Sequence, residues 1–263
     1  MPFVDVEGLR TFYESKGKGQ PLLLIHGSAC THSIWRRQLD YFGQRCYVIA
    51  VDLMGHGKSE IAISPSQISI RQYMEFVNNF LEALNIQKAT LIGHSLGGAI
   101  SIEFCLNLPD KVECLGLVNT GAKLGVNPEL LSMLRKDFRK ALTAGLETIL
   151  CKSEEADEIR RLITEEMLKT KPAVGLADFE ACNRFDSRET LSQIRKPTLI
   201  IGGTEDLLTP RWFQRYLHQK IANSKLRTID GVGHFPMIEK PEKFNAILFE
   251  FLEKYIGLPR YLQ

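Results

Sequence analysis

The stretch Gly93-His94-Ser95-Leu96-Gly97-Gly98 decides how the chain folds around it. An apolar run at residues 89–92 precedes it, and a helical pattern follows it from residue 96. A G-x-S-x-G pattern between a buried strand and a helix predicts a sharp turn, in which the flanking glycines relieve crowding around a strained serine. The Ser95 hydroxyl would then stand clear of the sheet at a helix N-terminus, where negative charge is favoured. Ser95 is a candidate nucleophile, although the same motif alone also suits a serine that only caps the helix.

Short apolar runs recur along the chain, and each is typical of a strand buried on both faces. They lie at residues 21–25, 47–51, 89–92, 115–118 and 197–201, and helical patterns at 34–42, 70–84, 96–108, 211–221 and 242–256 separate most of them. Residues 2–15 alternate in polarity and break at 7–8, which predicts a β-hairpin. Strands that alternate with helices predict an α/β fold, with a mostly parallel central sheet covered by helices on both faces.

Residues 123–191 break this rhythm, because they carry helical periodicity and no strand-like run. We expect helices within 128–150, 154–169 and 177–184. This segment is interpreted as a helical cap inserted into one α/β core. The predicted division is therefore residues 1–122 and 192–263 for the core and 123–191 for the cap.

Composition excludes several classes of partner. Lys and Arg number 33 against 31 Asp and Glu, a net charge of +2, so no broad attraction to nucleic acid or anionic membrane is expected. No apolar run approaches the roughly 20 residues that span a bilayer, and the N-terminus lacks the pattern of a secretory signal. We therefore expect a cytoplasmic protein without membrane insertion. The six cysteines have no metal-ligand spacing, which predicts reduced thiols and no metal site.

A serine hydroxyl needs a base, and that base needs a carboxylate to hold it. His234 lies in a glycine-rich loop after the last strand-like run, residues 226–229, at the sheet edge where ligands bind. Asp206 follows the run 197–201 and is the candidate acid, with Glu205 as its nearest rival. Asp230 is too close to His234 in sequence to reach its ring. The order Ser95, Asp206, His234 is that of the α/β-hydrolase arrangement.

Two other histidines are interpreted differently. His94 adjoins Ser95, but adjacent residues in such a turn point apart. His218 falls on the solvent side of a helical pattern.

Two backbone N–H groups are candidates for an oxyanion hole. Residues 26–30, His-Gly-Ser-Ala-Cys, follow the strand at 21–25, and the N–H of Ser28 could face the nucleophile. The N–H of Leu96, directly after Ser95, would be the second donor. His26 is expected to brace this loop by hydrogen bonding.

Five motifs in this order resemble the α/β-hydrolase superfamily over nearly the whole chain: His26-Gly27, residues 52–59, 93–98, 202–210 and 231–236. The resemblance implies a structural turn at 52–59. A serine at position 95 differs from the aspartate nucleophile of haloalkane dehalogenases and epoxide hydrolases, and His94 differs from the G-N-S-M-G-G pattern of carbon–carbon bond hydrolases. Residues 179–210 resemble the enol-lactonase and carboxylesterase branches.

That resemblance implies a serine hydrolase that cleaves a small or medium carboxylic ester through an acyl-enzyme. Its partner would be a small-molecule ester, with no metal or organic cofactor. A lactonase, a thioesterase, a carbon–carbon bond hydrolase and a small-molecule receptor with little turnover remain alternatives on the same three residues.

An apolar stripe in the cap could floor an acyl pocket, or could only attach the cap to the sheet. Its members are Met133, Leu134, Phe138, Leu142 and Leu146, which would act with Trp35, Leu207 and Phe235.

Overall fold

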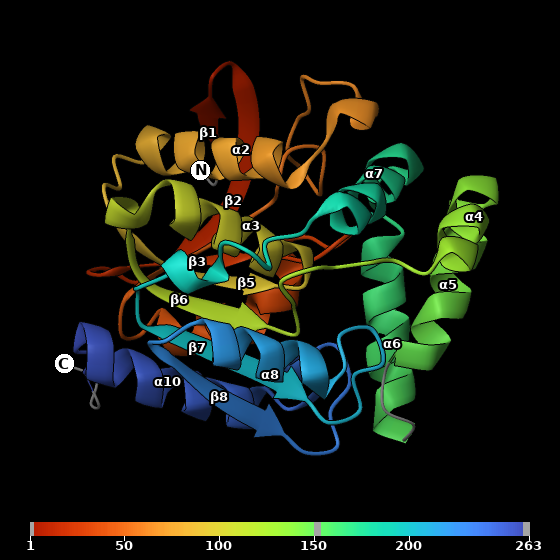
Figure 1. Cartoon of the computed structure of the whole chain (residues 1–263). Coiled ribbons are helices and arrows are strands. Elements are labelled where there is room, and N and C mark those ends of the chain that lie inside the picture. The colour runs from red at the N-terminus through yellow and green to blue at the C-terminus, as the bar shows by residue number, and fades with distance from the viewer. Residues whose placement is uncertain (1–2, 150–153, 260–263) are drawn as a thin grey trace.

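A twisted eight-stranded sheet runs through the molecule in the computed structural model, which describes residues 3–149 and 154–259 (Figure 1). The strands are β1 Phe3–Val6, β2 Leu9–Lys16, β3 Pro21–Ile25, β4 Tyr47–Val51, β5 Ala89–His94, β6 Val112–Val118, β7 Thr198–Gly203 and β8 Ser224–Ile229. Their order across the sheet is β1-β2-β4-β3-β5-β6-β7-β8. The β1–β2 and β2–β4 pairs are antiparallel, and all the others are parallel. The predicted α/β fold with a mostly parallel sheet is therefore confirmed.

The expected N-terminal hairpin is formed by β1 and β2. Glu7 and Gly8 both have positive φ, 53° and 85°, which matches the right-handed twist of the two strands in a tight turn. Residue 2 of the predicted hairpin lies outside the described residues.

Helices cover both faces of the sheet because the buried strands are apolar on both sides. Leu23, Ile25 and their counterparts in neighbouring strands pack with α2 (Ile70–Ala83), α3 (Leu96–Asn107) and α8 (Arg211–Lys220). Leu22 and Leu24 point to the opposite face and pack with α1 (Arg36–Phe42) and α10 (Pro241–Ile256). Each such side chain contributes about 1.5–3 kcal/mol when fully buried, so burial of the central strands strongly stabilises the fold.

In the described part of the chain, four α-helices lie between β6 and β7: α4 Pro128–Lys136, α5 Phe138–Ile149, α6 Glu154–Met167 and α7 Pro172–Arg184. In Figure 1 they form the right-hand side of the molecule, where the arrows of β6, β7 and β8 point. The pattern at 128–150 divides into two helices at Asp137, whose extended backbone ends α4. Helix α7 begins at Pro172, earlier than expected, because proline is well suited to the first turn. Leu150 lies outside the described residues, and the division into core and cap remains a prediction.

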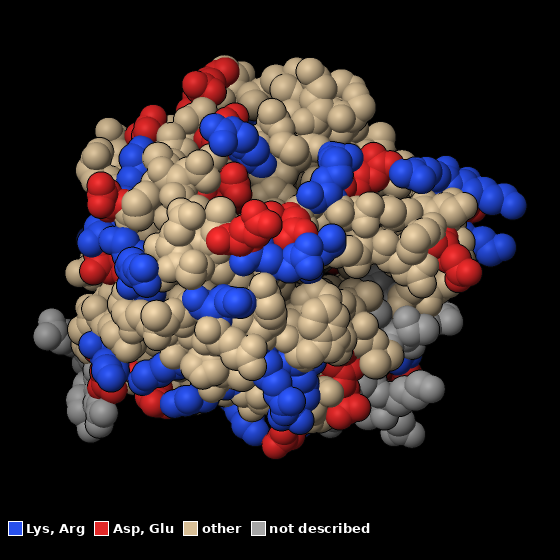
Figure 2. Space-filling view, in the orientation of Figure 1, with Lys and Arg blue, Asp and Glu red and all other residues tan. Residues whose placement is uncertain are grey.

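The surface carries charges of both signs. Figure 2 shows Lys and Arg interspersed with Asp and Glu over the face in view, without a large patch of one sign. Among residues 3–149 and 154–259, no helix is long and apolar enough to cross a membrane.

The described cysteines are free and buried: Cys30, Cys46, Cys105, Cys114 and Cys182. Cys151 lies outside the described residues.

Candidate active site

Ser95 occupies a strained turn between β5 and α3. Its backbone has φ 52° and ψ −113°, a conformation that residues other than glycine rarely adopt. The Ser95 N–H donates to the Val118 carbonyl at 3.0 Å, and the Thr120 hydroxyl donates to the Ser95 carbonyl at 2.8 Å. A Cβ on Gly97 would lie 2.3 Å from the Ile25 carbonyl oxygen, so glycine is required there. These contacts hold the turn that the motif predicts.

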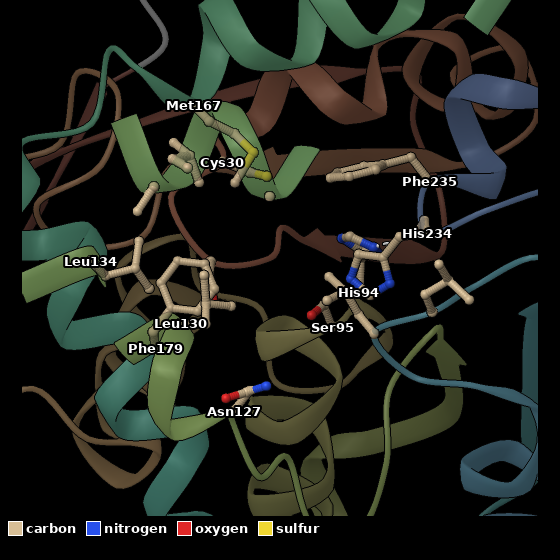
Figure 3. Close-up of a pocket in the computed structure, with 16 residues that line it drawn as sticks. Cys30, His94, Ser95, Asn127, Leu130, Leu134, Met167, Phe179, His234 and Phe235 are labelled. Carbon is tan, nitrogen blue, oxygen red and sulfur yellow. Dashed lines mark hydrogen bonds between the residues drawn. The ribbon is translucent and has the colours of Figure 1, made fainter. Parts of the chain in front are cut away.

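His234 and Asp206 lie together, as predicted from the sequence. His234 Nδ1 is 2.9 Å from Asp206 Oδ2, and both side chains are buried. Since an ionised carboxylate only accepts hydrogen bonds, Nδ1 carries the proton and donates a hydrogen bond to Asp206. The Nε2 atom of a neutral His234 is then free to accept a proton. His234 and Ser95 line the same cavity, and Figure 3 draws their side chains next to each other.

Asp206 is built to stay ionised. Burial acts to raise its pKa, but His234 and hydrogen bonds from His234 and Thr209 outweigh burial and lower the pKa of Asp206 to about 2. The Thr209 hydroxyl donates at 2.5 Å, and the N–H groups of Leu208 and Thr209 donate at 2.8 and 3.1 Å. The rivals Glu205 and Asp230 are both exposed. Asp206 is therefore the carboxylate that faces the histidine.

Three side chains hold the backbone around His234, and sequence reasoning did not assign them this role. His94 Nε2 donates to the His234 carbonyl at 2.8 Å, and Asn119 Nδ2 donates to the Gly233 carbonyl at 2.8 Å. Glu239 accepts from the N–H groups on both sides of His234, those of Gly233 and Phe235. Burial and the nearby His234 ring lower the pKa of His94 well below its usual range, so His94 is a neutral brace.

The two candidate oxyanion donors are the backbone N–H groups of Ser28 and Leu96. Within the described part of the chain, the N–H groups of Ser28 and Leu96 donate to no protein acceptor. Leu96 N is one of the free donors that every helix N-terminus presents. Ser28 lines the same cavity as Ser95, so both residues border the space that a substrate carbonyl would occupy.

His26 braces the loop that carries Ser28. Its Nδ1 lies 2.8 Å from the Gly27 carbonyl, and its Nε2 accepts from the Leu53 N–H at 3.1 Å. Burial and the neighbouring His56 lower the pKa of His26 to about 3, so the ring is neutral.

The turn at residues 52–59 is also structural. Buried Asp52 accepts from His32 and from the Lys58 N–H, and the Ser59 hydroxyl donates to the Asp52 carbonyl at 2.7 Å.

An apolar cavity of about 390 Å³ opens beside Ser95. Figure 3 shows Ser95 and His234 on one wall, with Leu130, Leu134 and Phe179 opposite. The remaining lining residues are Ser28, Cys30, His94, Asn127, Ala141, Leu142, Gly145, Met167, Leu207, Leu208 and Phe235.

Burial raises the pKa of the Cys30 thiol far above its usual range, which leaves the thiol protonated and makes it a poor nucleophile.

Some of the residues that could floor an acyl pocket line this cavity, and others do not. Leu134, Leu142, Leu207 and Phe235 line the cavity. Three others do not line it: Met133 is half exposed, Phe138 packs against Gly175, and Trp35 is fully buried beside Phe244. Helical spacing identified the apolar stripe but not the rotation of each helix. The side chain of Leu146 lies outside the described part.

A second cavity of about 240 Å³ meets the first at Ser95. The two share Ser28, Ser95, Asn127, Leu130, Phe179, Leu207 and Leu208. None of the described residues that line either cavity is Lys, Arg, Asp or Glu. The described residues also contain no group of three His, Cys, Asp or Glu side chains placed to hold a metal ion.

The chain belongs to the α/β-hydrolase family, because the family's model matches residues 20–241. A putative carbamate hydrolase, RutD, of Azorhizobium caulinodans is 29% identical over 267 residues, which cover 95% of this chain and 98% of the relative. Two solved structures are similar over most of both chains. An N-acyl homoserine lactone degrading enzyme has a TM-score of 0.87 and 29% identity, covering 95% of this chain and 100% of its own. A thermophilic esterase has a TM-score of 0.82 and 33% identity, covering 98% of each. The names of these relatives refer to different substrates, so the comparisons support a hydrolase without selecting its substrate.

Proposed function

We propose that this protein is a serine hydrolase that cleaves carboxylic esters through Ser95, His234 and Asp206. One observation carries the proposal. Ser95, on its strained turn, lines the same apolar cavity as His234, and Nδ1 of His234 is hydrogen-bonded to the buried carboxylate of Asp206. A structural role needs neither the strain nor the free imidazole nitrogen. The similarity to a thermophilic esterase supports the same conclusion.

In the first half-reaction, His234 Nε2 takes the proton from the Ser95 hydroxyl as Oγ attacks the ester carbonyl carbon. The carbonyl oxygen becomes an oxyanion, which the N–H groups of Ser28 and Leu96 stabilise. Asp206 stabilises the imidazolium that forms. The carbon–oxygen bond to the alcohol then breaks, and His234 returns its proton to the leaving oxygen.

In the second half-reaction, water attacks the acyl group on Ser95. His234 takes a proton from that water and returns it to Ser95 Oγ as the second tetrahedral intermediate collapses. The products are the free acid and the restored enzyme.

The cavities indicate an uncharged substrate. Leu134, Leu142 and Met167 line the larger of the two cavities and not the smaller one, so we assign the larger cavity to the acyl chain. The smaller cavity would receive the alcohol group. Because no described lining residue is Lys or Arg, a substrate carboxylate would enter without a partner, which is costly in an apolar site.

A lactone is the second candidate substrate. A lactone is a cyclic ester, and it would use the same nucleophile and oxyanion donors. The similarity to an N-acyl homoserine lactone degrading enzyme supports this alternative, since such a substrate joins an apolar acyl chain to an uncharged ring.

The proposal is tested by steady-state hydrolysis of p-nitrophenyl esters of increasing acyl length, with Ser95→Ala measured alongside. We expect turnover that peaks at short or medium chains and falls by about 10⁴-fold or more in the variant. An equal rate in both proteins would contradict the role of Ser95. Hydrolysis of lactones but not of open-chain esters would select the second candidate. Stoichiometric binding without turnover of either would indicate a receptor.

A further inference from the structure

A carboxylate on α7 is fully buried at the junction between the cap helices and the sheet. Asp178 Oδ2 accepts from the Ala29 N–H at 2.8 Å and from His56 Nε2 at 2.8 Å, while Oδ1 accepts from the Tyr73 hydroxyl at 2.5 Å. A buried carboxylate is costly unless hydrogen bonds satisfy it, and three donors do so here. Their positions in the sequence, 149, 122 and 105 residues away, show that the contact joins distant parts of the chain.

His56 supplies the compensating charge. Its Nδ1 faces the Met54 carbonyl at 3.2 Å and its Nε2 faces Asp178, so both nitrogens face acceptors. An imidazole that donates from both nitrogens is protonated. Burial acts to lower the pKa of His56, but Asp178 outweighs burial and raises it.

Ala29, the residue that Asp178 holds, directly follows the candidate oxyanion residue Ser28. Its backbone has φ 56°, in the left-handed region that disfavours residues with a Cβ. Hydrogen bonds fix the peptide groups on both sides of Ala29. Asp178, on α7, accepts from the Ala29 N–H, and the hydroxyl of Thr170, just before α7, donates to the Ala29 carbonyl at 2.9 Å. All three residues are buried. Together these contacts hold Ala29 in a backbone conformation that alanine rarely adopts.

We propose that Asp178 and Thr170 are positioning residues: they hold the peptide groups on the two sides of Ala29, so that the neighbouring Ser28 N–H faces the oxyanion formed at Ser95. The Ala29 N–H belongs to the peptide plane directly after Ser28, so its anchor fixes the backbone beside the donor. An oxyanion donor acts only when it is oriented before the reaction. The cap helices thus contribute to the chemistry as well as to the pocket. This inference rests on the proposed function.

We call the hydrogen bonds from Asp178 and Thr170 to the Ala29 backbone the clamp. Two matched pairs of variants test it. Thr170→Val removes the hydroxyl and keeps the shape, whereas Thr170→Ser keeps the hydroxyl. Asp178→Ala removes the acceptor for Ala29, whereas Tyr73→Phe removes a hydrogen bond to the same carboxylate and leaves the Ala29 contact. Thermal melts establish that each variant is folded at the assay temperature.

The readout is the rate at which a fluorophosphonate labels Ser95, because the new bond from Oγ to phosphorus develops an oxyanion and expels fluoride. Loss of one oxyanion donor typically costs 10²–10³ in rate, so we expect Thr170→Val and Asp178→Ala to be labelled at least roughly tenfold more slowly than wild type. Thr170→Ser and Tyr73→Phe should remain within about twofold, since an intact donor geometry keeps its full effect.

Equal labelling of the folded Thr170→Val variant and wild type would overturn the clamp and leave the proposed function intact. If Asp178→Ala does not fold, the two Thr170 variants decide alone. A wild-type protein that is not labelled, or that is labelled no faster than Ser95→Ala, would overturn the proposed function and the clamp together.

Discussion

At the scale of single residues, the site depends on groups held in states that they would not adopt alone. Ser95 and Ala29 both have positive φ, and each is fixed by hydrogen bonds at its backbone. Asp206 is buried yet ionised, because His234 and Thr209 stabilise its charge. Such strain and such buried charge are typical of functional sites.

Replacing Asp206 by asparagine should affect both turnover and acid stability. We expect kcat to fall by about 10⁴-fold, because the amide no longer fixes the His234 tautomer. The Asp206 pKa is about 2, below its ordinary value of 3.8. Its ionisation therefore contributes about 2 kcal/mol that is present above pH 4 and lost as the pH falls toward 2. Urea denaturation of Asp206→Asn between pH 6 and 2 should show a loss of stability smaller by that amount.

Glu205→Gln is the matched control for that experiment. Glu205 is adjacent and exposed, so its variant should keep wild-type turnover and wild-type acid sensitivity. A large loss of activity in Glu205→Gln, with Asp206→Asn active, would reverse the assignment of the acid.

At the scale of elements, the sequence predicts those features that depend on a local pattern of residues. It does not predict features that depend on contacts with residues far away in the chain. Apolar runs predict the central strands, and loop motifs single out Ser95, Asp206 and His234, which the structure places near one another, because turn chemistry is local. Which face of α4 meets the cavity depends on neighbouring helices, so helical spacing alone does not show that Leu134 lines the cavity while Met133 is half exposed. Asp178 gave no signal, since a single polar residue in a helical pattern does not reveal contacts more than 100 residues away.

The cap helices should set the preferred acyl length. Ala141 on α5 lines the larger cavity, and Ala141→Phe would fill part of it. Each buried CH₂ is worth about 0.8 kcal/mol, so we expect kcat/KM for octanoyl esters to fall tenfold or more while acetyl esters change little. Ala144→Phe places the same ring on the exposed side of α5 and should leave the profile unchanged. An unchanged profile in Ala141→Phe would contradict the assignment of this cavity to the acyl chain.

At the scale of the whole molecule, charge is balanced and interspersed. The net charge is +2, and the face in Figure 2 has no extended patch of one sign. The face in view is therefore not arranged to steer a charged substrate over a long range, and none of the described residues that line the two cavities is Lys or Arg. We therefore expect the enzyme to select substrates by how well their apolar groups fit the two cavities.

Comparison of methyl hexanoate with the monomethyl ester of adipic acid tests this at neutral pH, with hydrolysis followed by titration. The two esters have the same carbon chain and differ in a terminal carboxylate. We expect kcat/KM to be at least about tenfold higher for the neutral ester, because an unpaired carboxylate is costly to bury. A preference for the charged ester would contradict the substrate class.

The central claim is that Ser95 carries the acyl group during turnover. The most direct measurement is the mass of the enzyme after acid quenching during hydrolysis of a p-nitrophenyl ester, followed by peptide mapping. We predict one acyl group per chain, on the peptide that contains Ser95, and none in Ser95→Ala. An acyl group on another residue, such as Cys30, or sustained turnover by Ser95→Ala would contradict it.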